Sequence, residues 1–352
     1  MREVRTLIDF MEIVCDRPGL LDKLTKDESI SLSKMKEIVK AFISLTEAMS
    51  RREAGEEALE GNLRELINSY CEYIYGYQYK KEKEKELKTS ERKKTTFFYR
   101  GVSSSRYLLA PGIYRSDERH DENYYFNEIN VRCPDAFRSL DNLEKLTYMQ
   151  HYGCPTRLLD ITSNPLVALY FACCGGKDQP GVVYIFGVSS DEVLYASSDR
   201  IQMLCKLAEF KKADQESMRY LAYSNMLKGK FPQNRNSKYA NPVIEQYYHA
   251  VKRSNGAFER EIVPFDMLKP RFVQPNKGNP RILKQDGAFI LSGLDKDDSE
   301  SNVKIGKYLV ERIEVRPEDK QRILDHLEFV GINQATLFPE VDKVADYLRR
   351  RD

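Results

Sequence analysis

The fold of this chain is decided by residues 148–172, Y-M-Q-H-Y-G-C-P-T-R-L-L-D-I-T-S-N-P-L-V-A-L-Y-F-A. Apolar residues lead into this stretch at helical spacing: Leu143, Leu146 and Met149. The helix that they predict ends at Gly153, because glycine favours the position just beyond a helix C-terminus. Polar residues, which are costly to bury, therefore lie between two apolar runs of the sequence.

The second half of the stretch predicts a strand followed by a buried helix. Pro155 prevents the first helix from resuming, and residues 158–161 are short and apolar enough for a buried strand. Ser163 or Asn164 can cap the next helix, with a proline as its first residue. Residues 166–174 are almost wholly apolar, so we expect a core helix there.

Polar side chains gather at the junctions of these elements: Gln150, His151, Thr156, Arg157, Asp160, Thr162 and Ser163. Either they pin the junction or they line a ligand pocket, since a strand-to-helix turn is a usual place for one. For Arg157 and Asp160 the structural interpretation is favoured, with the two paired to each other or to backbone. For His151 and the pair Thr162-Ser163 both interpretations stand equally.

Composition limits the class of protein. The 352 residues suggest about two domains, and 56 basic against 54 acidic residues give a net charge of +2, which argues against a globally basic nucleic-acid binder. No apolar run of 18 residues and no signal-peptide pattern is present, and the seven cysteines are scattered. We expect a cytoplasmic protein without a membrane span. With four histidines, we also expect no metal site.

Hydrophobic spacing divides the chain near residue 93. Residues 1–93 are predicted as a helical N-terminal region that serves packing, homo-oligomerisation or a partner, beginning with an amphipathic helix through Val4, Leu7 and Met11. The alternating charges of residues 79–94 predict a solvated helix end or linker. Residues 94–352 mix strands with helices and end in C-terminal helices, so the predicted fold class is α+β with a mixed α/β domain.

That second domain opens on a β-branched and aromatic strand, residues 95–99, followed by Arg100-Gly101. An arginine at the end of a buried strand suits anion binding through its planar fork, and glycine allows a close approach of backbone. A salt bridge from Arg100 to an acid at the edge of the core is an equal alternative.

Further strands are predicted at residues 181–188, 262–265, 288–291 and 307–315. Helices are predicted in the second half of residues 123–140 and at 197–228, 318–330 and 340–350. Residues 281–285 fit a helical turn and 286–287 a tight turn, which places Gln285 to reach a pocket. Residues 228–242 form a basic loop, more typical of a surface insertion than of a lid.

Three blocks of this sequence resemble the FRG domain family, named for an aromatic-Arg-Gly signature. They are Tyr99-Arg100-Gly101, residues 149–172 and residues 279–289, and the resemblance covers about residues 95–340. Ile161 departs from it, since an aromatic residue is expected there. The resemblance implies a bacterial setting and an antiviral defence or toxin-like role, without giving a reaction.

The order of the polar elements is also similar to that of ADP-ribosyltransferases, which use NAD. By that resemblance Arg100 meets the pyrophosphate, Thr162-Ser163 the nicotinamide ribose, and Gln285 the reacting centre, while His151 holds a ribose hydroxyl or the acceptor. Tyr99, Gly101 and Arg157 complete the expected binding set. A carboxylate is usual where Gln285 stands, and the acids near it in sequence are Asp286, Glu259 and Glu261.

Two other functions use the same groups. One is a non-catalytic sensor that binds a nucleotide or a nucleic-acid end through Arg100, Arg157 and the basic loop. The other is metal-free phosphoryl chemistry with His151 as general base and the two arginines as clamps. The acceptor, whether protein, nucleic acid or small molecule, is left open.

Overall fold

The computed structural model of the chain describes residues 2–15, 75, 78–79, 94–115, 119–226, 230–231, 242–259, 261–295 and 303–349. Most of the predicted N-terminal helical region, the charged segment before residue 94 and most of the basic loop at 228–242 lie outside the described residues. Among the described helices, none combines the length and apolar character that a membrane crossing requires.

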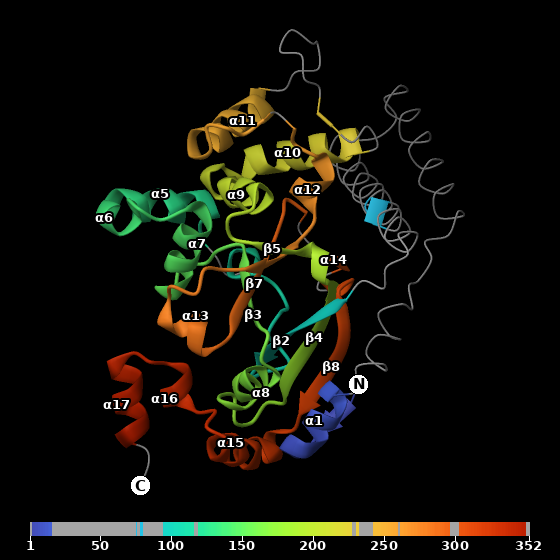
Figure 1. Ribbon diagram of the computed structural model, residues 1–352, viewed down its shortest axis with the longest axis vertical. Coiled ribbons are helices and arrows are strands. Elements are labelled where there is room, and N and C mark those ends of the chain that lie inside the picture. The colour runs from blue at the N-terminus through green and yellow to red at the C-terminus, as the bar shows by residue number, and fades with distance from the viewer. Residues whose placement is uncertain are drawn as a thin grey trace, which may run out of the picture.

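The described strands form one eight-stranded mixed sheet in the order β1-β8-β4-β2-β3-β7-β6-β5 (Figure 1). The two outermost pairs are parallel and the inner pairs are antiparallel. The strands are β1 (Arg2–Val4), β2 (Thr95–Val102), β3 (Leu158–Thr162), β4 (Gly181–Ser189), β5 (Val193–Tyr195), β6 (Arg271–Gln274), β7 (Gly287–Leu291) and β8 (Leu309–Val315). The fold is α+β, as the sequence predicts.

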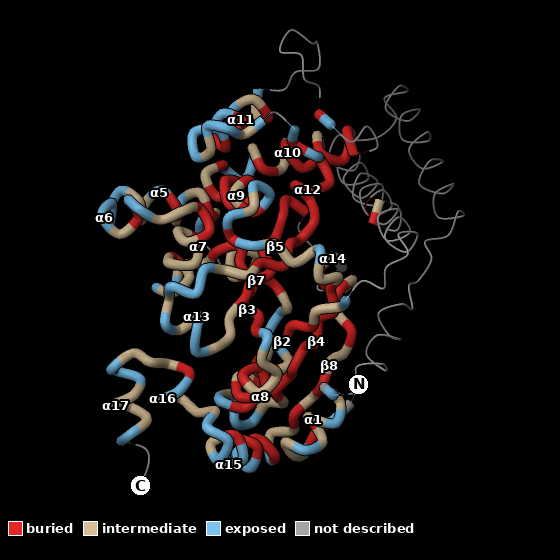
Figure 2. Tube along the Cα trace, viewed as in Figure 1, coloured by how far each residue is buried: buried red, intermediate tan, exposed pale blue. Residues whose placement is uncertain are grey.

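Helices cover both faces of this sheet, as the alternation of side chains in β2 shows. Phe97 and Tyr99 pack in a cluster beneath α8 (Pro165–Cys173), α1 (Leu7–Cys15) and α15 (Lys320–Phe329). Phe98 and Val102 belong to the larger cluster on the other face. Strand β4 beside β2 is buried along most of its length (Figure 2). The other α-helices in the described part of the chain are α5 (Glu122–Arg132), α6 (Pro134–Phe137), α7 (Asn142–His151), α9 (Asp199–Cys205), α10 (Lys212–Asn225), α11 (Pro242–Ser254), α12 (Pro264–Leu268), α13 (Pro280–Lys284), α14 (Val303–Gly306), α16 (Gln334–Leu337) and α17 (Val341–Arg349).

The helix–strand–helix order predicted for residues 148–172 is confirmed as α7, β3 and α8. Gly153 follows α7 at φ 86°, a left-handed conformation that glycine adopts without strain. Of the two alternative caps for the second helix, Asn164 is the one used, since its side-chain oxygen accepts the N–H of Leu166 at 3.0 Å. The capped helix is buried along most of its length.

Two other predictions are wrong. Residues 262–265 form no strand, since α12 begins at Pro264 and the strand of this region is β6. Proline lacks the N–H that a ladder needs, and its fixed φ suits the first turn of a helix. The long helix predicted over 197–228 is interrupted at Phe210 and Lys211, which separate α9 and a short 3-10 turn from α10.

The start of the chain also differs from the prediction, because Arg2–Val4 form strand β1 instead of the first helical turn. This strand pairs in parallel with β8, Val4 lying opposite Val315. Phe10 on α1 is fully buried, and the ring centroid of Tyr75 lies 5.2 Å from that of Phe265. Described parts of the predicted N-terminal region therefore share the core of the mixed domain.

We predict that Phe10→Ala lowers the free energy of unfolding by about 3–5 kcal/mol, because it empties a fully buried aromatic site. Ile8→Ala on the same helix is the matched control: Ile8 is 72% exposed, so its loss should change stability by less than about 0.5 kcal/mol. Denaturant unfolding of both variants measures the difference. Equal stability of the two would show that α1 does not pack on the core of the protein in solution.

Candidate functional site

The candidate site lies where the two halves of the sheet separate. β2 pairs with β4 over eight residues and β3 with β7 over five, but β2 and β3 meet at one position, Tyr99 opposite Thr162. Beyond it the strands diverge around a cavity of about 270 Å³. Six of the residues predicted for a site line this cavity: Tyr99, Arg100, Gly101, His151, Thr162 and Gln285.

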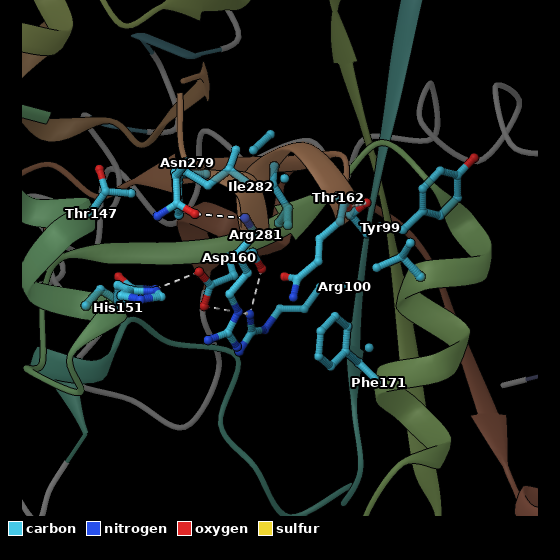
Figure 3. Close-up of a pocket in the computed structure, with 18 residues that line it drawn as sticks. Tyr99, Arg100, Thr147, His151, Asp160, Thr162, Phe171, Asn279, Arg281 and Ile282 are labelled. Atoms are coloured by element: carbon cyan, nitrogen blue, oxygen red, sulfur yellow. Dashed lines mark hydrogen bonds and ion pairs between the residues drawn. The ribbon is translucent and has the colours of Figure 1, made fainter. Parts of the chain in front are cut away.

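Arg100 extends from β2 into the gap between the strands (Figure 3). Its Nη1 donates to the main-chain oxygen of Asp160 at 2.6 Å and lies 3.8 Å from the carboxylate Oδ2 of the same residue. Burial lowers the pKa of Arg100, and the Asp160 carboxylate opposes that change. Its buried Nε has no hydrogen-bond partner among the described residues. The two alternatives for Arg100 thus combine: it is ion-paired and it faces the cavity.

Asp160 is the group that sequence reasoning did not place in the site. Its side chain is 63% exposed although its neighbours in β3 are buried, and it lines the cavity beside Arg100. The Nε2 of Gln150 donates to its Oδ1 at 2.7 Å. The predicted pairing with Arg157 is therefore wrong, and a lone acid within the run L-L-D-I-T was the available signal.

Arg157 does not belong to the cavity, which corrects its predicted role in binding. It is fully buried, and its Nε donates to Glu122 Oε2 at 2.7 Å while its Nη2 donates to Gln215 Oε1 at 3.1 Å. Burial works against the charge, but the Glu122 carboxylate with its hydrogen bond, together with Tyr114 and Cys205, outweighs it and raises the pKa of Arg157. A buried arginine needs such a partner, and this one comes from α5, distant in sequence. Arg157 therefore has a structural role.

Gly101 allows a close backbone approach, as predicted, but the approaching backbone is that of α8. A Cβ at Gly101 would lie 1.7 Å from the carbonyl oxygen of Ala168, and one at Gly181 on β4 would lie 2.1 Å from that of Ala172. The two glycines and two alanines let the helix lie directly on the strands. The glycine of the signature is thus first a packing residue.

The polar groups at the β3–α8 turn hold neighbouring segments together. Thr162 Oγ1 donates to the main-chain oxygen of Gln285 at 2.7 Å and accepts the N–H of Asn164 at 3.0 Å. Ser163 is exposed outside the cavity lining, and its hydroxyl donates to Asp286 O at 3.4 Å. The Gln285 amide donates to the main-chain oxygen of Leu337 at 3.0 Å. Their hydrogen bonds therefore serve the fold.

A second guanidinium, also missed from the sequence, comes from α13. Arg281 lines the cavity, and its guanidinium carbon lies 4.6 Å from the ring centroid of Phe338. The Phe338 ring also packs edge-on against Phe171 of α8, with centroids 5.9 Å apart. The C-terminal Thr336–Pro339 segment thus holds a cation at the cavity, a role that no local pattern reveals.

His151 ends α7 and lies half-buried in the cavity wall, its ring edge-on to Tyr152 at 4.9 Å between centroids. Ile161, the departure from the family pattern, is buried and also lines the cavity. Within the part of the chain that the structure describes, no cluster of three His, Cys, Asp or Glu residues has the geometry to hold a metal ion. The cavity offers two guanidinium groups, one carboxylate and one imidazole.

Comparison with known proteins covers the first two of the three blocks named above, whereas residues 279–289 lie outside the match. Residues 95–180 match the family model described as FRG domain. This range runs from β2 through β3 to the end of α8, so it supplies Arg100, Gln150, His151 and Asp160. No curated protein and no solved structure matches the chain.

We predict that Gly101→Ala lowers the free energy of unfolding by about 3 kcal/mol or more, because the new methyl group collides with the backbone of α8. Gly256→Ala is the control, since a Cβ there meets nothing within 4 Å, and it should change stability by less than about 0.5 kcal/mol. Denaturant midpoints measure both. A stable Gly101→Ala variant that fails to bind ligand would instead make Gly101 a binding residue.

Proposed function

We propose that this chain, an FRG-domain protein, uses NAD in an ADP-ribosyltransferase-like reaction at the cavity between β2 and β3. One observation carries the proposal: Arg100, Arg281 and the exposed carboxylate of Asp160 line a single cavity. Transfer from NAD needs cations for the pyrophosphate and a negative group near the ribose carbon that becomes positively charged.

The two arginines supply the anion-binding part. Arg100 lines the cavity, where its guanidinium can donate hydrogen bonds to a phosphate oxygen. Arg281 is stacked on Phe338, so its fork is held in place before a ligand arrives. Figure 3 shows the side chains of Arg100, Asp160 and His151 around the same space. An anionic ligand fits this wall best.

Asp160 takes the role proposed from the sequence for Gln285. The Gln285 amide is held by Leu337, whereas the Asp160 side chain is 63% exposed in the cavity. A carboxylate beside the anomeric carbon stabilises oxocarbenium-like charge, as the paired acids of glycoside hydrolysis do. The carboxylate missing from the predicted set is therefore assigned to β3.

In the proposed reaction the bond between the ribose anomeric carbon and the nicotinamide nitrogen breaks, and its electron pair leaves with neutral nicotinamide. A nucleophilic oxygen or nitrogen of the acceptor forms the new bond to that carbon, and the proton that it loses passes to His151. The cavity volume, about 270 Å³, is just below the range of about 300–1,000 Å³ usual for ligand pockets. It suits the nicotinamide-ribose part of NAD and the adjoining pyrophosphate, with the adenosine part outside.

A second function, binding of a nucleotide or nucleic-acid end without turnover, is favoured by one observation. The Thr162 hydroxyl and the Gln285 amide, both predicted to act on the substrate, are engaged by the fold. A sensor would use the arginines in the same way, with an affinity that falls as salt rises and survives the loss of Asp160.

The bacterial defence or toxin-like role that the family resemblance implies is proposed together with the reaction, since consumption of NAD is harmful to a cell. Induced expression in a bacterial host should arrest growth, and Asp160→Asn at equal protein level should not. Growth that continues with an enzymatically active wild type would overturn the toxin-like role and leave the reaction standing.

The reaction itself is tested with purified protein and NAD, following free nicotinamide. We expect Asp160→Asn to lower the rate of release by about 100-fold or more, because the charge is lost with little change of shape. The matched control is Asp135→Asn on α6, whose side chain is 87% exposed in an ion pair with Arg138. The control should keep the wild-type rate.

Two outcomes decide between the functions. Equal release by wild type and Asp160→Asn would remove the carboxylate from the mechanism. An absence of release, with ADP bound by the wild type and by Asp160→Asn but not by Arg100→Ala, would favour the binding module.

A further inference from the structure

We propose that Gln150 is a positioning residue that holds the Asp160 carboxylate apart from Arg100 and directs it into the cavity, an inference that rests on the proposed function. Gln150 belongs to the last turn of α7 and Asp160 to the middle of β3. Their side chains are joined at 2.7 Å, and both line the cavity.

The contact is the outer end of a hydrogen-bond chain that starts in the core. The N–H of Leu158 donates to Thr156 Oγ1 at 3.2 Å. The Thr156 hydroxyl then donates to Gln150 Oε1 at 2.6 Å, and Gln150 Nε2 donates to Asp160 Oδ1 at 2.7 Å. Thr156 is 1% exposed, so the chain runs from a buried hydroxyl to an exposed carboxylate.

The direction of this chain is fixed by chemistry. A carboxylate only accepts, so the amide must present its NH₂ group to Asp160 and its oxygen to Thr156. If the side-chain amide of Gln150 were flipped, its oxygen would face the Asp160 oxygens, and the two groups would repel each other. The carboxylate thus sets the orientation of the Gln150 amide, and the Thr156 hydroxyl, which donates to the amide oxygen, holds the side chain in that place.

The consequence appears at Arg100. Asp160 Oδ2 is 3.8 Å from Arg100 Nη1, longer than the roughly 2.7–2.9 Å of a charge-assisted hydrogen bond. Without Gln150 the carboxylate would turn toward Arg100 and form that closer pair. The turn would remove both groups from the ligand at once: the anion from the ribose carbon and the cation from the phosphate. Gln150 thus keeps two opposite charges available side by side.

The test uses three substitutions and one double-mutant cycle, with NAD and release of nicotinamide as the readout. We expect Gln150→Leu and Thr156→Val each to lower the rate by about 10- to 100-fold, the range for a misplaced reacting group. Thr156→Ser keeps the hydroxyl and should restore most of the rate. In an Asp160→Asn background, Gln150→Leu should cause no further loss, because Gln150 acts through Asp160.

ADP affinity gives a readout that does not need turnover. Gln150→Leu should weaken ADP binding about tenfold by releasing Asp160 onto Arg100, and it should leave the affinity of Asp160→Asn unchanged. If the wild type releases no nicotinamide, the enzymatic proposal fails while this cycle still tests the positioning. The positioning is overturned if Gln150→Leu keeps wild-type ADP affinity and rate, or if its effect is the same with and without the Asp160 carboxylate.

Discussion

The close approach of α8 to β2 and β4 is the constraint on which the rest of the site depends. It requires glycine at positions 101 and 181, where any side chain would collide with the carbonyl oxygens of Ala168 and Ala172. With Gly101 against the helix, the alternation of the strand sends Arg100 to the other side. The far end of α8 is fixed as well, since Lys320 Nζ donates to the main-chain oxygens of Gly175 and Gly176, each at 2.8 Å.

The cavity lies inside the sheet because β3 meets β2 only at its last residue. Thr162 pairs with Tyr99 and the chain then enters α8, whereas the earlier residues of β3 pair with β7 and not with β2. The Arg100 guanidinium donates a hydrogen bond to one main-chain carbonyl of the separated strand, that of Asp160. A charged side chain thus lies where a backbone ladder would otherwise continue, and the gap stays polar and open.

Arg100 and Arg157 were both predicted to bind a ligand, but they have different roles in the structure. Arg157 is fully buried and neutralised by Glu122, which leaves it no part in recognition of a ligand. Arg100 lines the cavity and keeps a longer contact of 3.8 Å to the carboxylate of Asp160, which is 63% exposed. The difference follows from the acidic partner. The Glu122 carboxylate is buried with Arg157 and can pair only with it, whereas the Asp160 carboxylate is exposed and is held by Gln150.

The local elements around residues 148–172, the α+β fold class and a strand at residues 95–99 can be predicted from the sequence alone. The signals that predict them are helical spacing, a glycine that ends a helix, a helix cap and an apolar run. Each involves only a few neighbouring residues, so it can be recognised without a structure. The tertiary structure alone decided which polar groups meet. Glu122 and Arg157, Arg281 and Phe338, and Gln285 and Leu337 are far apart in the chain, and their contacts arise only when separate elements pack together. Asp160 became a site residue for the same reason: its exposure depends on the divergence of β2 from β3, a property of the whole sheet.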